Sequence, residues 1–529
     1  MTLFTKTFKT TILFLALLEV LSFLGYYLPI VNKIGFFVIL IIALVLALTK
    51  LEYGVYLLLA ELFVGSKGYL FYFDYGGAII SLRIGLFLVI MGVWLFGLIK
   101  DRYARIAKQI GTDNLSTYQL TNLPTYYWLL FVAIAWGVFY GIVRSNSFNN
   151  IFFDANAWIY FLVIFPLYSS IKINEQVNNI LQIFFASLVD IIFKSLFVLW
   201  IFSHEIIGFS ADLYRWIRTS GVGEITPVAG NFYRVFFQSQ IYALLGFFIL
   251  LCLWYWQRRN VIPSLPAQTG GASNPPLSKG LGESTATVVE LDFSLRYASF
   301  EMTVLMAFSL LTVIISFSRS FWVAAAGGLV LFFAYLIFVA KESWLKLLKV
   351  AGILLAIAII DLAFLYVFIS FPRPSGVSLA SLLGDRISSS EAAGISRMNQ
   401  LEPLARSIIK HPLIGSGFGT TVTYKTLDPR ILRETPSGIY TTYAFEWGYL
   451  DILLKIGLVG LLIYLWLIWS IAKKIIFNFQ FSIFNSGLSF GFLLGLIALL
   501  LVNVFTPYLN HPLGIGYILI ASIVASKNS

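Results

Sequence analysis

Long apolar runs recur along almost the whole chain and limit how it can fold. Most of them approach the roughly 20 residues that a helix needs to cross a bilayer. Of the 529 residues, 59% are hydrophobic and 12% are charged, against about a quarter charged in soluble domains. We therefore predict an all-α, polytopic transmembrane helical bundle of about 12–14 spans. The runs lie at residues 10–30, 33–50, 52–65, 79–99, 124–143, 156–170, 176–202, 232–256, 298–318, 321–340, 347–370, 447–471, 482–504 and 512–525.

Basic residues at the ends of these runs predict the orientation. If the spans alternate, most Lys and Arg residues near span ends fall on one side, which the positive-inside rule assigns to the cytoplasm. Both termini are then cytoplasmic, in a multi-pass protein of the inner (cytoplasmic) membrane. The first run follows Lys6 and Lys9 as in a signal peptide. No small-residue cleavage site follows, which indicates a retained first helix.

The formal net charge of +11 is largely explained by this topology, so we expect membrane lipids and no nucleic acid as partners. Cys252 is the only cysteine and lies in an apolar run, which excludes a disulfide framework and a thiolate metal cluster. The sequence contains no Walker A, DxD, HExxH or Cys/His metal spacing. We expect no cofactor and no metal, and cytoplasmic nucleotide chemistry is disfavoured.

The polar segments divide the chain into five parts. Residues 257–297 are rich in Pro, Gly, Ser and Thr and predict a flexible cytoplasmic loop. Residues 371–446 form the largest loop on the outer side. The remaining parts are transmembrane helices at 1–256, at 298–370 and at 447–529.

The large outer loop has a helical pattern. Its apolar residues recur at steps of three and four, at Ile395, Met398, Leu401, Leu404 and Ile408. Residues 388–390 are serines that can cap a helix. Proline interrupts the pattern at position 403, so we expect two short helices joined at residue 402, lying along the membrane interface or over a cavity.

Four arginines lie at outer ends of spans, where the positive-inside rule does not favour them: Arg83, Arg144, Arg234 and Arg319. Snorkelling to lipid phosphates would explain them, as would pairing with Asp74, Asp154 or Glu224. Alternatively, two guanidinium groups that face one cavity would bind an anion, because each forms bidentate contacts with phosphate oxygens. The membrane-borne anion of this kind is a lipid diphosphate.

Two segments of the sequence resemble the O-antigen ligase and Wzy-type polymerase family. The first is "SFSRSFWVAAAGGLV", which is similar to the family's serine–arginine turn and small-residue helix. The second is "SRMNQLEPLARSIIKHPLIGSGFGT" followed by "YAFEWGYLDILLKIGLVGLLIYL". It resembles an arginine-led outer helix, an H-P-L-x-G-x-G turn and a descending helix. Their order along the chain also matches that family, over roughly residues 300–470.

The resemblance implies a GT-C-like membrane glycosyltransferase that acts in surface polysaccharide biosynthesis. It implies transfer of a glycan from an undecaprenyl-diphosphate carrier to a glycan or lipid acceptor, with inversion and without metal, on the outer face of the membrane. Arg319 matches the arginine of the serine–arginine turn, and Arg234 is the expected second diphosphate ligand. Ligases commonly have histidine at the base position, whereas this chain has Glu446 there. Ligase and polymerase both remain open.

Glu446 has a structural alternative, because a carboxylate near a helix N-terminus is favoured by the helix dipole. Further candidate substrate or loop contacts are Arg144, Arg397, Arg406, Tyr443 and Tyr449. In the H-P-L-x-G-x-G turn we assign structural roles to His411, Pro412, Gly415 and Gly417. His511 and His204 are also interpreted as structural.

Two other classes of function compete with an enzyme. A polysaccharide flippase or secondary transporter would also have many spans and buried arginines, with charges deep inside the spans. The charges in the sequence instead cluster toward one face, which favours the enzyme. A membrane scaffold for envelope assembly would not need an arginine pair.

Overall fold

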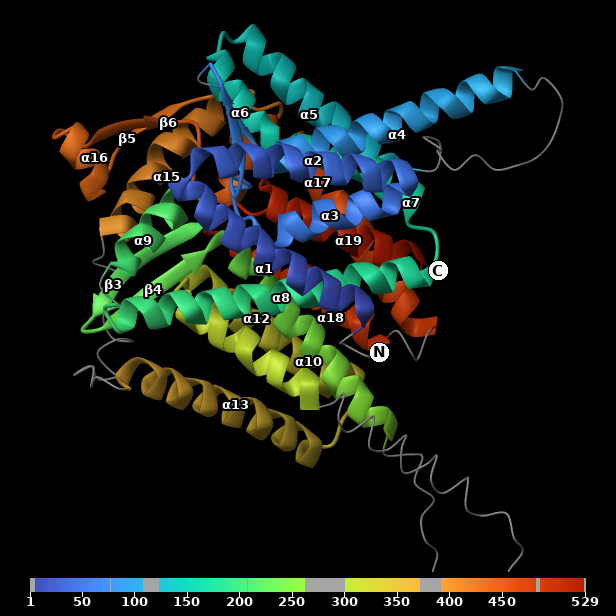
Figure 1. The fold of residues 1–529 in the computed structure, drawn as a ribbon, viewed down its shortest axis with the longest axis vertical. Coiled ribbons are helices and arrows are strands. Elements are labelled where there is room, and N and C mark those ends of the chain that lie inside the picture. The colour runs from blue at the N-terminus through green and yellow to red at the C-terminus, as the bar shows by residue number, and fades with distance from the viewer. Residues whose placement is uncertain are drawn as a thin grey trace, which may run out of the picture.

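The computed structural model describes residues 5–76, 78–107, 123–206, 208–261, 300–371, 392–481 and 486–527. Within these residues, 11 helices are long and apolar enough to cross a membrane, and two shorter apolar helices lie at Phe300–Ile315 and Pro512–Ser526. The chain is therefore the all-α polytopic helical bundle that its apolar runs predict (Figure 1).

The helices and strands follow the predicted runs closely. The first half of the chain contains α1 (Lys6–Tyr27), α2 (Pro29–Thr49), α3 (Leu51–Val64), β1 (Tyr72–Tyr75), β2 (Ala78–Ser81), α4 (Leu82–Ala107), α5 (Thr125–Val143), α6 (Phe148–Ile159), α7 (Ile164–Ser170), α8 (Asn174–Ser203), α9 (Phe209–Thr219), β3 (Gly223–Ala229), β4 (Phe232–Phe237) and α10 (Ile241–Val261). The second half contains α12 (Arg319–Ala334), α13 (Trp344–Ser370), α15 (Ala392–Lys410), β5 (Val422–Lys425), α16 (Pro429–Glu434), β6 (Ile439–Thr442), α17 (Gly448–Phe481), α18 (Ser486–Asn503) and α19 (Pro512–Lys527).

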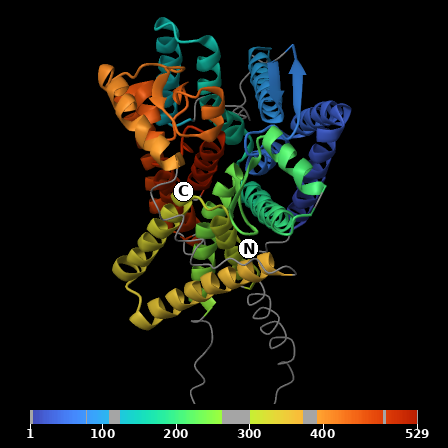
Figure 2. The same cartoon turned by 90° about the vertical axis from the view of Figure 1, so that its left-hand side faces the viewer.

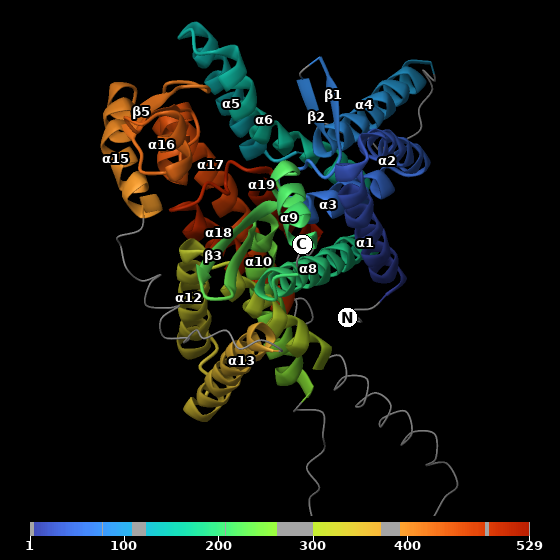
Figure 3. The same cartoon turned by 60° about the vertical axis from the view of Figure 1, so that its left-hand side comes forward.

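Helix α10 forms the centre of the bundle and is buried along almost its whole length. It packs against α18, α8 and α12, and α18 also contacts α17 and α19. By contrast, α12 and α13 are mostly exposed, and α13 lies at the edge of the bundle (Figures 1 and 3). Apolar side chains such as Leu345, Leu355 and Ile360 on α13 remain exposed, as expected for a helix that faces lipid tails rather than water.

The extramembrane elements gather at one end of the bundle. In Figure 1, α9, β3, β4, α15, α16, β5 and β6 all lie at the left-hand end, which faces the viewer in Figure 2. The start of α1 and the end of α19 lie toward the opposite end. We call the end with these elements the outer end, following the orientation predicted from basic residues.

Three antiparallel two-stranded hairpins lie at the outer end: β1–β2, β3–β4 and β5–β6. The apolar runs predict none of them. Most of β2 and all of β4 lie within the predicted spans 79–99 and 232–256, so the helices there begin later than expected, α4 at Leu82 and α10 at Ile241. The β3–β4 hairpin has a bulge between Pro227 and Ala229. Its second strand, β4, carries the candidate site residue Arg234 and leads into the buried helix α10.

The structure corrects the prediction of two short helices joined at Glu402. Residues Ala392–Lys410 form one helix, α15, with Pro403 inside it. Proline removes one backbone hydrogen bond and normally breaks a helix. Packing on both sides of Pro403 opposes that break, since Leu404 is fully buried and the indole of Trp447 donates to the carbonyl of Arg397 at 2.9 Å. The expected serine caps at 388–390 lie outside the described residues, as do residues 262–297 of the expected cytoplasmic loop.

The expectation that charges cluster at one face is also wrong in part. Lys194 on α8 pairs with Glu19 on α1, and both lie well inside their spans. Asp361 is buried within α13. The sequence analysis did not predict a buried charge at any of these positions, because each is a single polar residue within a strongly apolar run.

Candidate active site at the outer end

The serine–arginine turn connects helix Phe300–Ile315 to α12. Its tight reversal places Phe317 in the left-handed region, with φ of 47°, which an aromatic residue adopts only under constraint. The constraint comes from neighbouring side chains, since the amide of Ser318 donates to the hydroxyl of Ser316 at 3.2 Å and the hydroxyls of Ser318 and Ser320 lie 3.0 Å apart. Arg319 is therefore the first residue of α12, at a fixed position at the outer end.

Arg234 lies directly beside this turn. Its Nε donates to the backbone carbonyl of Ser316 at 2.9 Å, and its guanidinium stacks 4.9 Å from the ring centre of Phe236. The rings of Phe232 and Phe317 are 4.9 Å apart and fix β4 against the turn. Arg234 is thus held against the turn that carries Arg319, although 85 positions separate the two arginines in the chain.

The hairpin between α18 and α19, residues 504–511, connects the other parts of the site. The hydroxyl of Thr506 lies 3.1 Å from that of Ser320 in the serine–arginine turn. The ring of Tyr508 is 5.9 Å from that of Phe321, and its hydroxyl donates to the carbonyl of Gln238 at 2.9 Å. Burial raises the pKa of Tyr508, which Arg234 opposes, so the phenol remains a donor. Sequence reasoning gave His511 of this hairpin a structural role and named none of the hairpin's residues as site candidates.

Glu446 lies just before α17 and forms an ion pair with Arg397 of α15. The side chains of Glu446 and Arg397 are 48% and 40% exposed, so both groups remain open to a ligand. The neighbouring Trp447 contacts the ring of Phe505 at 5.8 Å, one residue before Thr506. Trp447, the neighbour of Glu446, is therefore linked through the hairpin 504–511 to the turn that carries Arg319.

A buried ionic cluster supports this end of α17. Lys455 lies between Asp154 of α6 and Asp451 of α17, with Nζ 2.7 Å from the Asp451 carboxylate. The amide of Gly419 donates to Asp154 at 2.9 Å, and Asn510 donates to Asp451. Four segments that are distant in sequence thus meet in one network. Asp451 and Lys455 are four residues apart on a helix, a spacing that could have identified this pair from sequence.

The H-P-L-x-G-x-G turn inserts into a kink of α17. Gly457 has a φ of 68° and breaks the helix there, which frees backbone groups on both sides. The amide of Gly417 donates to the carbonyl of Lys455 at 3.0 Å, and the amide of Leu458 donates to that of Pro412 at 2.9 Å. Gly415 and Gly417 have φ values of 77° and 83°, which side-chain-bearing residues rarely adopt.

The remaining predicted residues lie in several environments. Arg144 donates to Nε2 of His411 and stacks on Tyr140, so it is at the side of the turn. Arg406 pairs with Glu402 on the exposed face of α15. The hydroxyl of Tyr449 donates to the carbonyl of Leu500 at 2.9 Å, a packing contact.

Tyr443 is closer to the polar centre. Burial raises the pKa of its phenol, and the charge of Asp154 adds to this effect. Tyr443 therefore lies close enough to the ionic cluster for the charges of Asp154 and Lys455 to act on its phenol.

Two further predictions concern structural pairings. Arg83 does not pair with Asp74, because its guanidinium contacts both carboxylate oxygens of Glu61 at 3.0 and 3.1 Å. His204 bonds to the carbonyls of Trp200 and Phe371 at the end of α8. Glu61 neutralises Arg83, so this arginine is a structural residue.

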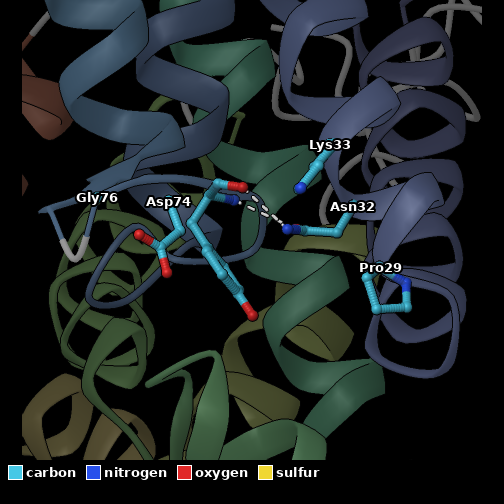
Figure 4. A pocket seen from close by; sticks show the side chains of 6 residues that line it. Pro29, Asn32, Lys33, Asp74 and Gly76 are labelled. Atoms are coloured by element: carbon cyan, nitrogen blue, oxygen red, sulfur yellow. Dashed lines mark hydrogen bonds between the residues drawn. The ribbon is translucent and has the colours of Figure 1, made fainter.

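A separate pocket of about 470 Å³ opens between the start of α2 and the β1–β2 hairpin. Asn32 fixes its wall, with hydrogen bonds of 2.9 and 3.2 Å to the backbone of Tyr72. Lys33 and Asp74 lie on its rim (Figure 4). Neither Arg234, Arg319 nor Glu446 lines this pocket.

The comparisons with known proteins place part of this site in a family. Residues 304–465 match the family model described as O-antigen ligase. The chain carries an O-antigen ligase family domain. The match includes Arg319, the large outer loop, Glu446 and Lys455, whereas Arg234 and the hairpin 504–511 lie outside it. A comparison with curated proteins gave no match.

Proposed function

We propose that this protein is a membrane glycosyltransferase of the O-antigen ligase or polymerase type. In this proposal it moves a glycan from an undecaprenyl-diphosphate carrier to a glycan or lipid acceptor at the outer face of the inner membrane, and both termini are cytoplasmic. The observation that carries the proposal is the hydrogen bond from Arg234 to the turn that holds Arg319, because this turn lies inside the family match.

Two guanidinium groups that face one site are suited to a diphosphate leaving group. Each presents a planar fork of donors to phosphate oxygens and stays charged at any working pH. Charge on the diphosphate grows as the bond to the sugar breaks. Donors fixed in advance at that position lower the barrier without reorganisation. Here Arg234 is fixed by Ser316 and Phe236, and Arg319 by its place at the start of α12.

The proposed reaction needs one proton acceptor. The acceptor hydroxyl attacks the anomeric carbon opposite the diphosphate, the bond from carbon to phosphate oxygen breaks, and the electron pair leaves with the diphosphate. Glu446 takes the hydroxyl proton. Its ion pair with Arg397 orients the carboxylate, and its partial exposure lets an acceptor approach. No metal takes part in this scheme.

One observation favours a second candidate, a flippase or secondary transporter for lipid-linked glycans. Lys194 of α8 pairs with Glu19 of α1 inside the spans, and Asp190 is also buried within α8. Transporters place charges at such depths. The two candidates differ in chemistry, since a transporter moves the lipid-linked glycan without cleaving its diphosphate bond.

Reconstitution in proteoliposomes with a lipid-diphosphate glycan and an acceptor tests the proposal by measuring carrier release and glycan product. Arg319→Ala and Glu446→Gln should each lower turnover by about 100-fold or more, as loss of a charge-stabilising or proton-transfer group does. Arg218→Ala is the matched control, because Arg218 is an outer arginine in a surface pair with Glu224 at 2.8 Å.

Wild-type turnover in both site variants would refute the site assignment. Movement of the glycan across the bilayer with an intact diphosphate bond would favour the transporter. Size-exclusion profiles of all variants establish that the folded protein is retained.

A further inference from the structure

The loop between α3 and β1 presents a lysine at the outer end. Arg83 donates to the carbonyl of Ser66 at 2.6 Å, and the amide of Ser239 donates to the Ser66 hydroxyl at 3.3 Å. Ser66 and Gly68 both have positive φ values of 49° and 88° and are buried, whereas Lys67 between them is exposed. Lys67 therefore extends from a rigid support. It lies beside Gly221, just before β3, because a Cβ added to Gly221 would be 3.0 Å from Cδ of Lys67.

His511 approaches the same region from the hairpin 504–511. The amide of Leu513 donates to Nδ1 of His511 at 3.3 Å, so the neutral ring carries its proton on Nε2. Burial, together with the charges of Arg83 and Lys67, lowers the pKa of His511 to about 3, which keeps the ring neutral. Among the described residues, Nε2 has no hydrogen-bond partner, although part of the ring remains accessible.

Tyr508 connects His511 to the arginine pair. Its ring is 6.2 Å from that of His511 and 5.9 Å from that of Phe321, two residues after Arg319. Arg234 is close enough to Tyr508 to act on the pKa of its phenol. Arg234 and His511 therefore both lie near one buried tyrosine, which also packs against the first turn of α12, the helix that begins at Arg319. The charge of Lys67 acts on the same histidine.

We propose that Lys67 and His511 form a second phosphate-binding pair next to Arg234 and Arg319, so that a diphosphate is held with one phosphate on each pair. This inference rests on the proposed function for the identity of the ligand. Lys67 supplies positive charge, and Nε2 of His511 donates a neutral hydrogen bond. Arg83 does not contribute, because Glu61 already neutralises it.

The second pair has a reason in the chemistry. The free carrier diphosphate has one more negative charge than the glycan-linked carrier, so a third cation stabilises the charge that develops as the bond breaks. A neutral imidazole donor keeps its hydrogen bond across the physiological pH range. An imidazole with its Nδ1 occupied by Leu513 cannot take up the acceptor's proton there, so His511 binds phosphate rather than acting as the base.

Binding to the full-length protein in nanodiscs tests this site separately from catalysis. The probes are farnesyl diphosphate, farnesyl monophosphate and inorganic diphosphate. Wild type should prefer the diphosphate lipid over the monophosphate lipid. Lys67→Gln should lower affinity for farnesyl diphosphate about tenfold, as loss of a charge-assisted contact does, and change affinity for farnesyl monophosphate less than about twofold.

His511→Phe should also reduce the preference for diphosphate, and His511→Gln should restore part of it because the amide can donate. The matched control is Lys33→Gln, since Lys33 is an exposed outer lysine on the rim of the separate pocket in Figure 4. If inorganic diphosphate competes with farnesyl diphosphate and its binding depends equally on Lys67, the site binds diphosphates in general. If inorganic diphosphate does not compete, the site requires a diphosphate attached to a lipid. Both results support the pair.

An unchanged preference for diphosphate in Lys67→Gln and His511→Phe would overturn the pair. Equal losses for monophosphate and diphosphate would overturn it as well, since they would indicate a general change in the site. Retained diphosphate preference in a protein that transfers no glycan would refute the proposed function and leave the phosphate pair intact.

Discussion

Lys455 allows a sharp test of what holds the active-site end of α17 in place. Its side chain is 2% exposed and lies between two carboxylates, Asp154 at 6% exposure and Asp451 at 2%. The group of three carries a net charge of −1 when both carboxylates are ionised. Lys455→Met removes the only cation and leaves two carboxylates facing each other away from water.

Breaking a buried ion pair by removing one partner costs about 3–5 kcal/mol. Lys455→Met should reach the upper end of that range, because it leaves two buried carboxylates without a cation. Asp451→Asn should cost only about 1 kcal/mol, since it loses one charge-assisted contact and leaves the neutral pair of Asp154 with Lys455. The expected order of destabilisation therefore depends on the arrangement of charges rather than on side-chain size.

Equilibrium unfolding in mixed micelles, followed by helical circular dichroism, measures these differences in the free energy of unfolding. Lys346→Met is the matched control. Lys346 also pairs with an acid four residues away, Glu342, at 2.9 Å, but the lysine side chain is 61% exposed. The carboxylate of Glu342 is only 6% exposed and keeps the hydrogen bond from Tyr255 at 2.8 Å, so we expect a loss of about 1 kcal/mol. If Lys455→Met costs no more than Lys346→Met, the cluster does not hold α17, and the reasoning is wrong.

Three further predictions concern local features. Gly417→Ala should destabilise the protein by several kcal/mol, because the new Cβ would lie 2.3 Å from the amide nitrogen of Gly141. Gly76 also has a positive φ but lies in open space, so Gly76→Ala should cost about 1–2 kcal/mol. Thermal unfolding of the two variants measures the difference. Because the pKa of His511 is low in the folded protein, unfolding takes up a proton below about pH 6.5. The free energy of unfolding should therefore fall by about 1.4 kcal/mol per pH unit from about pH 6.5 toward 3. A pH series on His511→Gln should lack this slope. Pro403→Ala should stabilise α15 by about 1–3 kcal/mol, because it restores one backbone hydrogen bond. Amide hydrogen exchange in that helix should then become slower. Faster exchange would contradict the continuous helix.

The sequence predicted the bundle well because a span is a local property. An apolar run of the right length determines a helix without reference to its neighbours, so the expected runs recur in the structure from α1 to α19. The serine–arginine turn was also predictable, because its residues are consecutive in the sequence. The partner of Arg234 was not predictable, since its contact with Ser316 depends on how β4 packs against a turn 82 residues away.

The sites that sequence missed share one physical feature. Asp154, Lys455 and Asn510 lie in separate helices or turns, and each alone is an ordinary polar residue near a span end. Their meaning comes from tertiary packing, which brings opposite charges together where water is excluded. The same packing overrides the local signal at Pro403, where contacts on both sides hold one helix.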